Sequence, residues 1–313
     1  MNDKEHVAVI GGANVDVHGI PHAPLRRGDS NPGRIRWSAG GVARNVAENL
    51  SRLGLDARLI SAVGDDDSGR FLLQHCREAG IGVEGMRRFD SLPTAIYLSV
   101  QNFDGDLDVA VADMRVVDRL SAAEIEPHAA VLEGARLIVV DCNLPADVLN
   151  WLFSRFARQT FYVDTVSQTK AAVVRPHLAC VHTLKASRAE AASLSGLPVD
   201  DEGELKRLSA WFHDKGVSRD FVTLGAAGVF FSDGETTGVR ANTDDGASIL
   251  NTGGAGDAFL SGIVRASLDR QPLSQAVDFG LAVARLTLSD WRACSPELSM
   301  EQVTQALGES RGY

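Results

Sequence analysis

Short strand patterns alternate with helical patterns along most of this chain. Apolar, β-branched runs typical of buried strands recur at 7–10, 57–62, 137–140, 160–163, 181–184 and 220–224. Helical periodicity fills residues 42–53, 67–79, 145–157 and 201–214, and the final third is mostly helical, at 255–268, 273–289 and 299–308. Strands that alternate with helices join through right-handed crossovers into a parallel sheet. The sequence therefore predicts the α/β class, with a mostly parallel central sheet flanked by helices.

Two segments, at about 13–38 and 92–113, break this alternation. The first contains several prolines and glycines and ends in an alternating polar and apolar stretch at 34–37. The second alternates strictly and has a hairpin turn at Asp104 and Gly105. We expect the two segments to pair into a small, mostly antiparallel sheet that stands off the main sheet and covers a cleft as a lid. The alternative is that they are plain edge strands.

Composition and charge exclude several classes of protein. The 313 residues are 44% hydrophobic, which is enough for a packed core, and the net charge of −10 argues against a nucleic-acid polymer as partner. No apolar run approaches membrane-spanning length, and no secretory pattern opens the chain, so we expect a cytoplasmic protein without a membrane partner. The four cysteines lie far apart and form no metal-ligand spacing, as is typical of free thiols.

The most specific motif is NTGGAGDAFLSG at 251–262, which precedes and opens a helix. Its glycines allow close approach of a ligand to the backbone, and the unpaired amides of a helix start favour an anion. Gly254, Ala255 and Gly256 are therefore candidates for an anion hole. Asp257 follows them directly and is placed to accept a proton from an attacking hydroxyl group. The alternative for Asp257 is an ordinary acidic residue in the first turn of a helix.

Two further motifs carry polar groups suited to a sugar. The sequence AGGVARNVAENLSRLG at 39–54 opens a helix, where Gly40, Gly41, Arg44 and Asn45 are candidates for binding sugar hydroxyls. The sequence GGANVDV at 11–17 follows the first strand, and its Asn14 and Asp16 alternate onto one face, as a ribose diol requires. Taken alone, each motif also fits a flexible helix start or a turn. The sequence contains no P-loop, HExxH or GxSxG motif.

The motifs at 39–54 and 251–262, in this order and at this separation, resemble those of the ribokinase-like (PfkB) carbohydrate kinase family. The resemblance covers essentially the whole chain. It implies one kinase domain over residues 1–313, with a lid formed by the two insertions. It also implies that Asp257 is the general base, that residues 255–257 form the anion hole, and that Asp16, Gly41 and Asn45 hold a ribose.

Several other segments are similar to the pseudouridine kinase branch of that family. They are DSNPGRI at 29–35, GGVARN at 40–45, VADM at 111–114, DCN at 141–143, VDTVS at 163–167 and HTLK at 182–185. This similarity implies phosphorylation of the 5′-hydroxyl of pseudouridine by ATP, with Ser30, Asn31, Asp113 and Asn143 at the substrate. The alternatives are another ribosyl kinase, such as a ribokinase or a purine nucleoside kinase, and a non-catalytic nucleoside-binding regulator on the same fold.

The resemblance also implies where ATP and Mg²⁺ bind. The candidates for binding the nucleotide are Lys185, Ser187, Glu190, Thr223, Gly225 and Gly228. Glu190 is expected to hold Mg²⁺ through water. The family usually has Asn-x-x-Glu where this chain reads SRAE at 187–190, and Asn251 stands where Asp is common, which leaves activation by a monovalent cation such as K⁺ open. The apolar strands of the lid are compatible with a homodimer.

Overall fold

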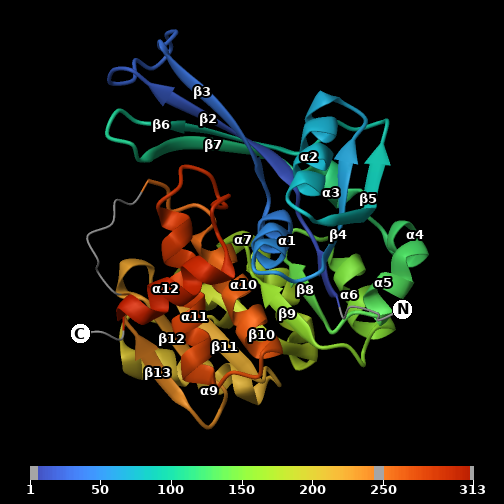
Figure 1. Ribbon diagram of the computed structural model, residues 1–313, viewed down its shortest axis with the longest axis vertical. Coiled ribbons are helices and arrows are strands. Elements are labelled where there is room, and N and C mark those ends of the chain that lie inside the picture. The colour runs from blue at the N-terminus through green and yellow to red at the C-terminus, as the bar shows by residue number, and fades with distance from the viewer. Residues whose placement is uncertain (1–5, 243–249, 311–313) are drawn as a thin grey trace.

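The computed structural model describes residues 6–242 and 250–310, and its largest element is a nine-stranded sheet (Figure 1). The strand order is β13-β12-β11-β10-β9-β8-β1-β4-β5. All neighbours are parallel except β11–β12 and β12–β13, so the predicted mostly parallel sheet is confirmed. The strands are β1 Val7–Ile10, β4 Ala57–Gly64, β5 Gly82–Phe89, β8 Leu137–Asp141, β9 Phe161–Asp164, β10 Val181–Ser187, β11 Arg219–Thr223, β12 Val229–Ser232 and β13 Thr237–Arg240.

Helices cover both faces of this sheet because its central strands are apolar on both sides. Val7 and Val9 belong to one buried cluster, whereas Ala8 and Ile10 belong to the other. The first cluster is covered by α1 Val42–Arg52, α2 Asp67–Glu78, α10 Ala255–Leu268, α11 Leu273–Leu288 and α12 Met300–Ser310. The second is covered by α3 Arg115–Asp118, α4 Ala122–Ile125, α5 Ala129–Glu133, α6 Ala146–Arg155, α7 Gln168–Ala171, α8 Arg188–Ser195 and α9 Glu202–Asp214.

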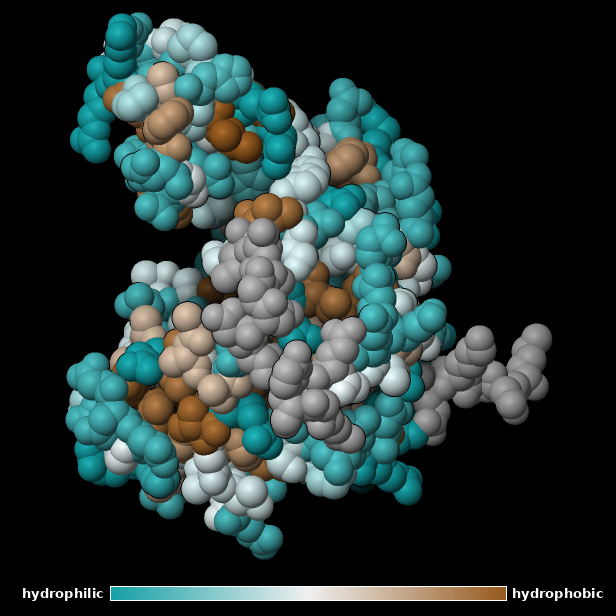
Figure 2. All heavy atoms as spheres, turned by 60° about the vertical axis from the view of Figure 1, so that its left-hand side comes forward, coloured by the Kyte–Doolittle hydropathy of each residue, from teal (hydrophilic) through white to brown (hydrophobic). Residues whose placement is uncertain are grey.

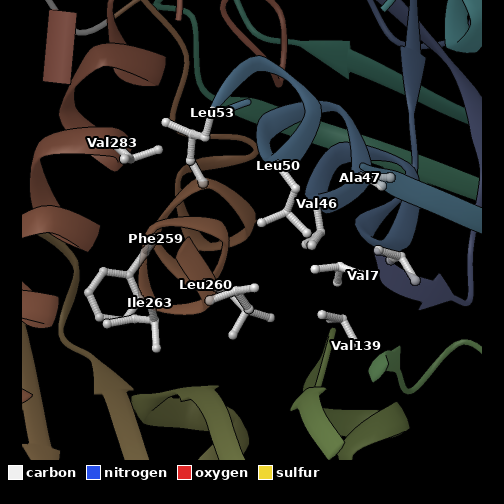
Figure 3. Close-up of a cluster of buried hydrophobic side chains, with 14 of the residues drawn as sticks. Val7, Val46, Ala47, Leu50, Leu53, Val139, Phe259, Leu260, Ile263 and Val283 are labelled. Atoms are coloured by element: carbon white, nitrogen blue, oxygen red, sulfur yellow. The ribbon is translucent and has the colours of Figure 1, made fainter. Parts of the chain in front are cut away.

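Helices α1 and α10 pack side by side over strand β1, as Figure 3 shows. Val46 and Leu50 of α1 face Leu260 of α10, with Val7 of the strand beneath them. Complete burial of a leucine such as Leu50 stabilises the fold by about 1.5–3 kcal/mol. This apolar packing sets the N-terminal ends of the two helices beside each other.

Strand β1 lies where the sheet reverses its winding direction. Strands β4 and β5 follow on one side of β1, and β8 to β13 follow on the other. At such a switch point the loops after neighbouring strands diverge and leave a crevice at the carboxyl ends of the strands. The loop after β1 contains Gly11, Gly12 and Ala13, within one of the predicted sugar motifs.

A separate four-stranded sheet projects from the main body (Figure 1). Its order is β3-β2-β6-β7, with β2 Asn14–Pro21, β3 Gly33–Gly40, β6 Ile96–Gln101 and β7 Leu107–Asp113. Strand β2 pairs antiparallel with β3 and parallel with β6, and β6 and β7 form the predicted hairpin. The expected pairing of the two insertions into a small sheet is therefore confirmed, and only the β2–β6 pair is parallel.

Several elements were not predicted from the sequence. They are β5, the β12–β13 hairpin, α8, the short helices between 115 and 133, and the segment of α7 and 3₁₀ helix η2 Ala172–Cys180. Most are only three to five residues long, which is too short for periodicity to be recognised. No helix in the described ranges combines the length and the apolarity needed to span a bilayer.

Candidate active site

Asp141 links the loop after β1 to the start of α1 through hydrogen bonds. It is the last residue of β8 and is fully buried. Its Oδ2 accepts hydrogen bonds from the backbone N–H of Gly12, at 2.9 Å, and of Ala43, at 2.8 Å. Burial raises the pKa of Asp141, and the hydrogen bonds from Gly12 and Asn143 partly offset that rise. The sequence reading gave Asp141 no role, although an acidic residue at the end of a buried strand was a usable signal.

Asp257 lies in the first turn of α10, as its motif predicted. Its side chain is 7% exposed, and Oδ2 accepts a 2.7 Å hydrogen bond from Nδ2 of Asn45. Burial, and next the negative charge of Asp164, raise the pKa of Asp257 to about 7, against the lowering effects of Lys185 and Asn45. A carboxyl group with a pKa near neutrality can accept a proton and release it again at physiological pH.

The N-terminal turn of α10 presents free amides beside this carboxyl group. The N-cap Gly254 has φ 82°, and a Cβ there would lie 2.1 Å from the carbonyl oxygen of Ala293, so this position requires glycine. The first hydrogen bond of the helix runs from the N–H of Ala258 to the oxygen of Gly254. The amides of Ala255 and Gly256 precede it and are free to bind an anion.

Lys185 supplies a buried cation at the same turn. Its Nζ lies 2.9 Å from Oδ2 of Asp164, and both side chains are buried. A Cβ on Gly256 would lie 2.6 Å from this Nζ, so the ammonium group sits directly against the predicted anion hole. Burial disfavours the charge of Lys185, but Asp164, Asp257 and Glu190 outweigh that effect and raise its pKa. These neighbouring carboxylates therefore favour the charged form of Lys185.

Asn45 and Arg44 open helix α1 and have different environments. Asn45 reaches Asp257, as described above. Arg44 is 1% exposed, and its guanidinium group donates to the carbonyl oxygens of Ala39 and Gly40 and contacts Glu48. The prediction that Arg44 binds the sugar is not supported, because its donors are already engaged inside the protein.

Asp16 and Asn14 lie at the start of β2, next to the double glycine. Nδ2 of Asn14 donates to Oδ1 of Asp16 at 2.6 Å, and a Cβ on Gly40 would lie 2.2 Å from Oδ2 of Asp16. Gly41 has φ 97°, and a Cβ there would meet the oxygen of Gly12 at 2.5 Å. The structure thus brings the two predicted sugar motifs into contact. Burial raises the pKa of Asp16.

The residues predicted to bind the nucleotide lie together, at and just after the ends of strands β10 and β11. Ser187, at the end of β10, pairs in register with Thr223, at the end of β11. The turn after Thr223 places Gly225 at φ 62° and Gly228 at φ 103°, which favour glycine. Ser187 caps helix α8 in a reciprocal arrangement, because its N–H donates to Oε2 of Glu190 and its Oγ accepts from the Glu190 N–H. The serine at this position therefore holds Glu190 in place.

Glu190 is the acidic residue that fits a metal at this end of the site. Its Oε2 also accepts from Oγ1 of Thr165 at 2.7 Å, which leaves Oε1 for a metal-bound water. Within the described residues, no group of three or more His, Cys, Asp and Glu side chains forms a dedicated metal cage. This arrangement fits Mg²⁺, which keeps several waters and binds mainly through phosphates and one or two carboxylates.

Of the residues predicted to read the base, Asp113 lies in register with Ile96 and Val15, at the Asn14 end of the small sheet, whereas Ser30 and Asn31 lie far from this site. They are in the loop beyond Pro21 and Gly33, the far ends of β2 and β3. Pro21 is seven residues from Asn14, which is about 23 Å along a strand. Asn31 stabilises that loop, since its Oδ1 accepts from the Arg26 N–H at 2.8 Å. Asp113 pairs with Arg115 at 2.6 Å. In this structure the Asn31 side chain therefore stabilises a turn.

Asn143 does lie at the crevice, although its amide is engaged. Its N–H donates to Oδ1 of Asp141 at 2.9 Å, and its side-chain oxygen accepts from Nζ of Lys170. A Cβ on Gly12 would lie 2.6 Å from its Nδ2, so the amide packs against the loop after β1. Asn143 therefore lies next to the sugar motif, and its binding to the substrate stays a prediction.

Comparisons with known proteins agree with this geometry. The sequence matches the family described as pfkB family carbohydrate kinase over residues 4–299. It is 35% identical to "Pseudouridine kinase" of Escherichia coli (strain K12) over 97% of this chain and 96% of that protein. The structure is similar to a putative sugar kinase from Clostridium perfringens, with a TM-score of 0.86 and 28% identity over 98% and 97% of the two chains. It is also similar to an Arabidopsis thaliana ribokinase complexed with ribose and ATP, with a TM-score of 0.84 and 19% identity over 97% and 98%.

Proposed function

Because this chain belongs to the pfkB family of carbohydrate kinases, we propose that it transfers the γ-phosphoryl group of ATP to the 5′-hydroxyl of pseudouridine. The observation that supports pseudouridine as the substrate is the near full-length similarity to a pseudouridine kinase. The observation that supports phosphoryl transfer is the position of Asp257, whose buried carboxyl group lies beside free helix amides and a buried lysine. The products are pseudouridine 5′-phosphate and ADP.

Asp257 acts as the general base in this proposal. Its carboxylate takes the proton of the 5′-hydroxyl as that oxygen forms a bond to the γ-phosphorus, and the bond from phosphorus to the β,γ-bridging oxygen breaks. ADP leaves with the electron pair of that bond. The amides of Ala255 and Gly256 and the ammonium group of Lys185 stabilise the negative charge on the transferring group.

The remaining predicted residues position the two substrates. Asp16 and Asn14 accept and donate hydrogen bonds at the ribose diol, beside the Gly40–Gly41 backbone. The turn from Thr223 to Gly228 holds ATP. Glu190 would hold Mg²⁺ through water, and the ion would supply positive charge at the phosphates.

The four-stranded sheet is proposed to act as a lid over the crevice. Asp16 lies on β2 of this sheet and also at the sugar site. A movement of the sheet would therefore also move this part of the sugar site. Closure would bring the distal loop with Ser30 and Asn31 toward the base and would exclude water from the reaction. Asn31 is the proposed partner of the N1–H group, which pseudouridine has and uridine lacks.

A panel of substrates tests this function. ADP release is measured with ATP and Mg²⁺ on pseudouridine, uridine, inosine and ribose. We expect pseudouridine to exceed uridine in kcat/KM by at least about tenfold, since an unmatched hydrogen bond in a closed site costs about 1–3 kcal/mol. Asn31→Ala should narrow that gap more than it slows phosphorylation of ribose.

The possible outcomes test the proposed substrate and the proposed reaction separately. Equal efficiency on pseudouridine and uridine would overturn the pseudouridine assignment and leave the kinase intact. A preference for ribose or inosine would replace it with one of the other ribosyl kinases. Binding of nucleosides without ADP release on any substrate would instead favour a non-catalytic regulator on this fold.

A further inference from the structure

Arg44 contacts the residue that holds the base. One of its guanidinium nitrogens, Nη2, donates to Oδ1 of Asn45, and Nδ2 of the same Asn45 donates to Oδ2 of Asp257 at 2.7 Å. All three side chains are buried. A chain of hydrogen bonds therefore runs from Arg44 through one amide group to Asp257.

We propose that Arg44 is a positioning residue for catalysis, which fixes the Asn45 amide in the one orientation that donates to Asp257. This inference rests on the proposed role of Asp257 as base. Arg44 itself does not touch the substrate, because its side chain is 1% exposed and its donors face the protein interior.

The orientation of the amide follows from the chemistry of its two neighbours. A guanidinium group has donors and no acceptor, whereas a carboxylate accepts only. Asn45 must therefore turn its oxygen to Arg44 and its nitrogen to Asp257. The flipped amide would set two acceptors together at Asp257 and two donors together at Arg44. The second N–H of Asn45 remains for the sugar.

Arg44 can enforce this orientation because it is itself immobilised. Its Nε donates to the oxygen of Gly40 at 3.2 Å, and Nη2 donates to the oxygen of Ala39 at 2.9 Å. Its Nη1 is paired with Glu48, which is 2% exposed. Glu48 in turn binds Arg52 at 2.6 Å and His75 at 3.1 Å.

The orientation of the Asn45 amide affects the pKa of Asp257. Burial and the negative charges of Asp164 and Asp141 raise its pKa, whereas Lys185 and the Asn45 hydrogen bond lower it. The thiol of Cys294 is also near, and its own pKa is raised by burial. If the Asn45 amide loses its orientation, one of the lowering contributions is lost, so Asp257 should titrate at a higher pH.

A cavity of about 190 Å³ lies beside the guanidinium group and makes a direct test possible. It is lined by Arg44, Glu48, Arg52 and His75, together with Trp291 and Cys294. Truncation of Arg44 would join its vacated volume to this cavity. Guanidinium ion from solution can then occupy the position that the side chain has left.

The experiment compares Arg44→Ala with the wild-type protein. The ¹³C carboxyl resonance of Asp257, identified by its loss in Asp257→Asn, is followed against pH without substrate. We expect its midpoint to rise by about half a unit or more, equivalent to the loss of one hydrogen bond of about 1 kcal/mol. Millimolar guanidinium chloride should restore the midpoint, whereas sodium chloride at equal ionic strength should not.

A double-mutant cycle tests whether Arg44 acts through Asn45. In an Asn45→Ala background, Arg44→Ala should shift the midpoint no further. An equal shift in both backgrounds would mean that the charge of Arg44 acts directly, and would overturn the proposal. An unchanged midpoint in Arg44→Ala would overturn it as well. Arg44→Met keeps much of the buried volume but has no donor for the Asn45 amide, and Glu48 retains Arg52 and His75 as partners, so it gives the same test should the alanine variant not fold.

Arg265→Lys is the matched control. Arg265 also pairs with an acid four residues away, Asp269, and donates to a backbone oxygen, that of Leu53, but it does not touch Asn45. It should leave the Asp257 midpoint in place. Because the titration needs no turnover, it decides the proposal about Arg44 even if the substrate panel overturns the proposed reaction.

Discussion

At the scale of single residues, Asp257, the proposed base, must meet two opposing requirements. A base must lose its proton at the working pH, yet it must be basic enough to take one from a hydroxyl group. Burial and Asp164 raise its pKa to about 7, and Lys185 prevents a larger rise. The pKa therefore lies close to neutral pH, where both requirements are met.

We predict that Asp257→Asn lowers kcat by about two orders of magnitude or more, because the amide cannot accept the proton. In the wild-type protein, kcat/KM should rise with pH through about 7, because kcat/KM follows the ionisation of the free enzyme and only the ionised carboxylate can accept the proton. Both are measured by ADP release across pH 5.5–9, a range set at about 1.5–2 units around that midpoint. A variant that kept more than about a tenth of wild-type kcat would assign the base to another group.

Thermal unfolding of the same variant checks that its fold is intact. The pKa of Asp257 is higher in the folded state than its ordinary value of 3.8, so the folded protein loses stability as pH rises between about 4 and about 7. The neutral asparagine has no such loss. The Tm of Asp257→Asn should therefore equal or exceed that of the wild-type protein above pH 7, with ATP binding retained.

The sequence predicted some site residues better than others. Asp257 and Asn45 were predicted from two distant motifs and are in contact, as are Asp16 and Gly40. Asp141 and Asp164 lie at the ends of β8 and β9, within the DCN and VDTVS segments, but the sequence analysis gave them no role. Their role depends on which strands become neighbours, and only the sheet order decides that.

At the scale of elements, two positive-φ glycines show how tightly α1 is set against the loop after β1. Gly41, the N-cap of α1, has φ 97° and would place a Cβ 2.5 Å from the oxygen of Gly12. Gly196, the C-cap of α8, has φ 78° but has open space around its Cβ position. An alanine at Gly196 would adopt the left-handed helical region, with ψ 12°, whereas one at Gly41, with ψ 133°, would lie outside that region and would also clash, so both its backbone strain and its contacts are worse.

We predict that Gly196→Ala costs about 1–2 kcal/mol in the free energy of unfolding, the ordinary cost of a left-handed residue. Gly41→Ala should cost more, about 3 kcal/mol or above, because two backbone segments must separate. Urea unfolding measures both values. Gly41→Ala should also raise KM for the sugar substrate, since Gly40 lies against Asp16. Equal costs at the two positions would contradict the close packing of α1.

Prediction of elements from sequence succeeded where amphipathic or apolar runs are long. Helices α1, α2, α9 and α10 were predicted to within about one residue at each end, as their patterns extend over three turns or more. Helix α8 was missed because its buried positions are few, although Ser187 and Glu190 form a recognisable capping box. Strand β12 has four buried residues after a turn and was not predicted, although β1 and β9 are equally short and were.

At the scale of the whole molecule, the small sheet leaves an apolar face uncovered. Pairing in register aligns Trp37, Val17, Leu98 and Val111 in one row across the sheet. Ile35 and Val109 belong to the next row on the same face. Of these residues, Ile35, Trp37, Leu98, Val109 and Val111 are 42–62% exposed. Figure 2 shows such hydrophobic side chains among polar ones on the upper lobe, which is this sheet.

The opposite face of the same sheet carries the polar groups. Side chains alternate along a strand, so Asp16 and His18 point away from Val17. The sheet therefore presents Asp16 to the sugar site and its apolar face elsewhere. An exposed apolar face of this kind on a folded protein marks a contact surface. A second copy of the chain fits it, because each sheet can cover the other with the same residues.

We predict a homodimer that is held together by the apolar face of the small sheet. Light scattering after size exclusion should give twice the chain mass of 33.4 kDa. Val111→Lys should give the mass of a single chain, because a lysine cannot be buried in the centre of an apolar interface without a partner. Val239→Lys is the matched control, since Val239 is also exposed, at 42%, but lies on β13 of the central sheet. A monomeric wild-type protein, or a dimer that survives Val111→Lys and Ile35→Lys together, would show that this face has another use.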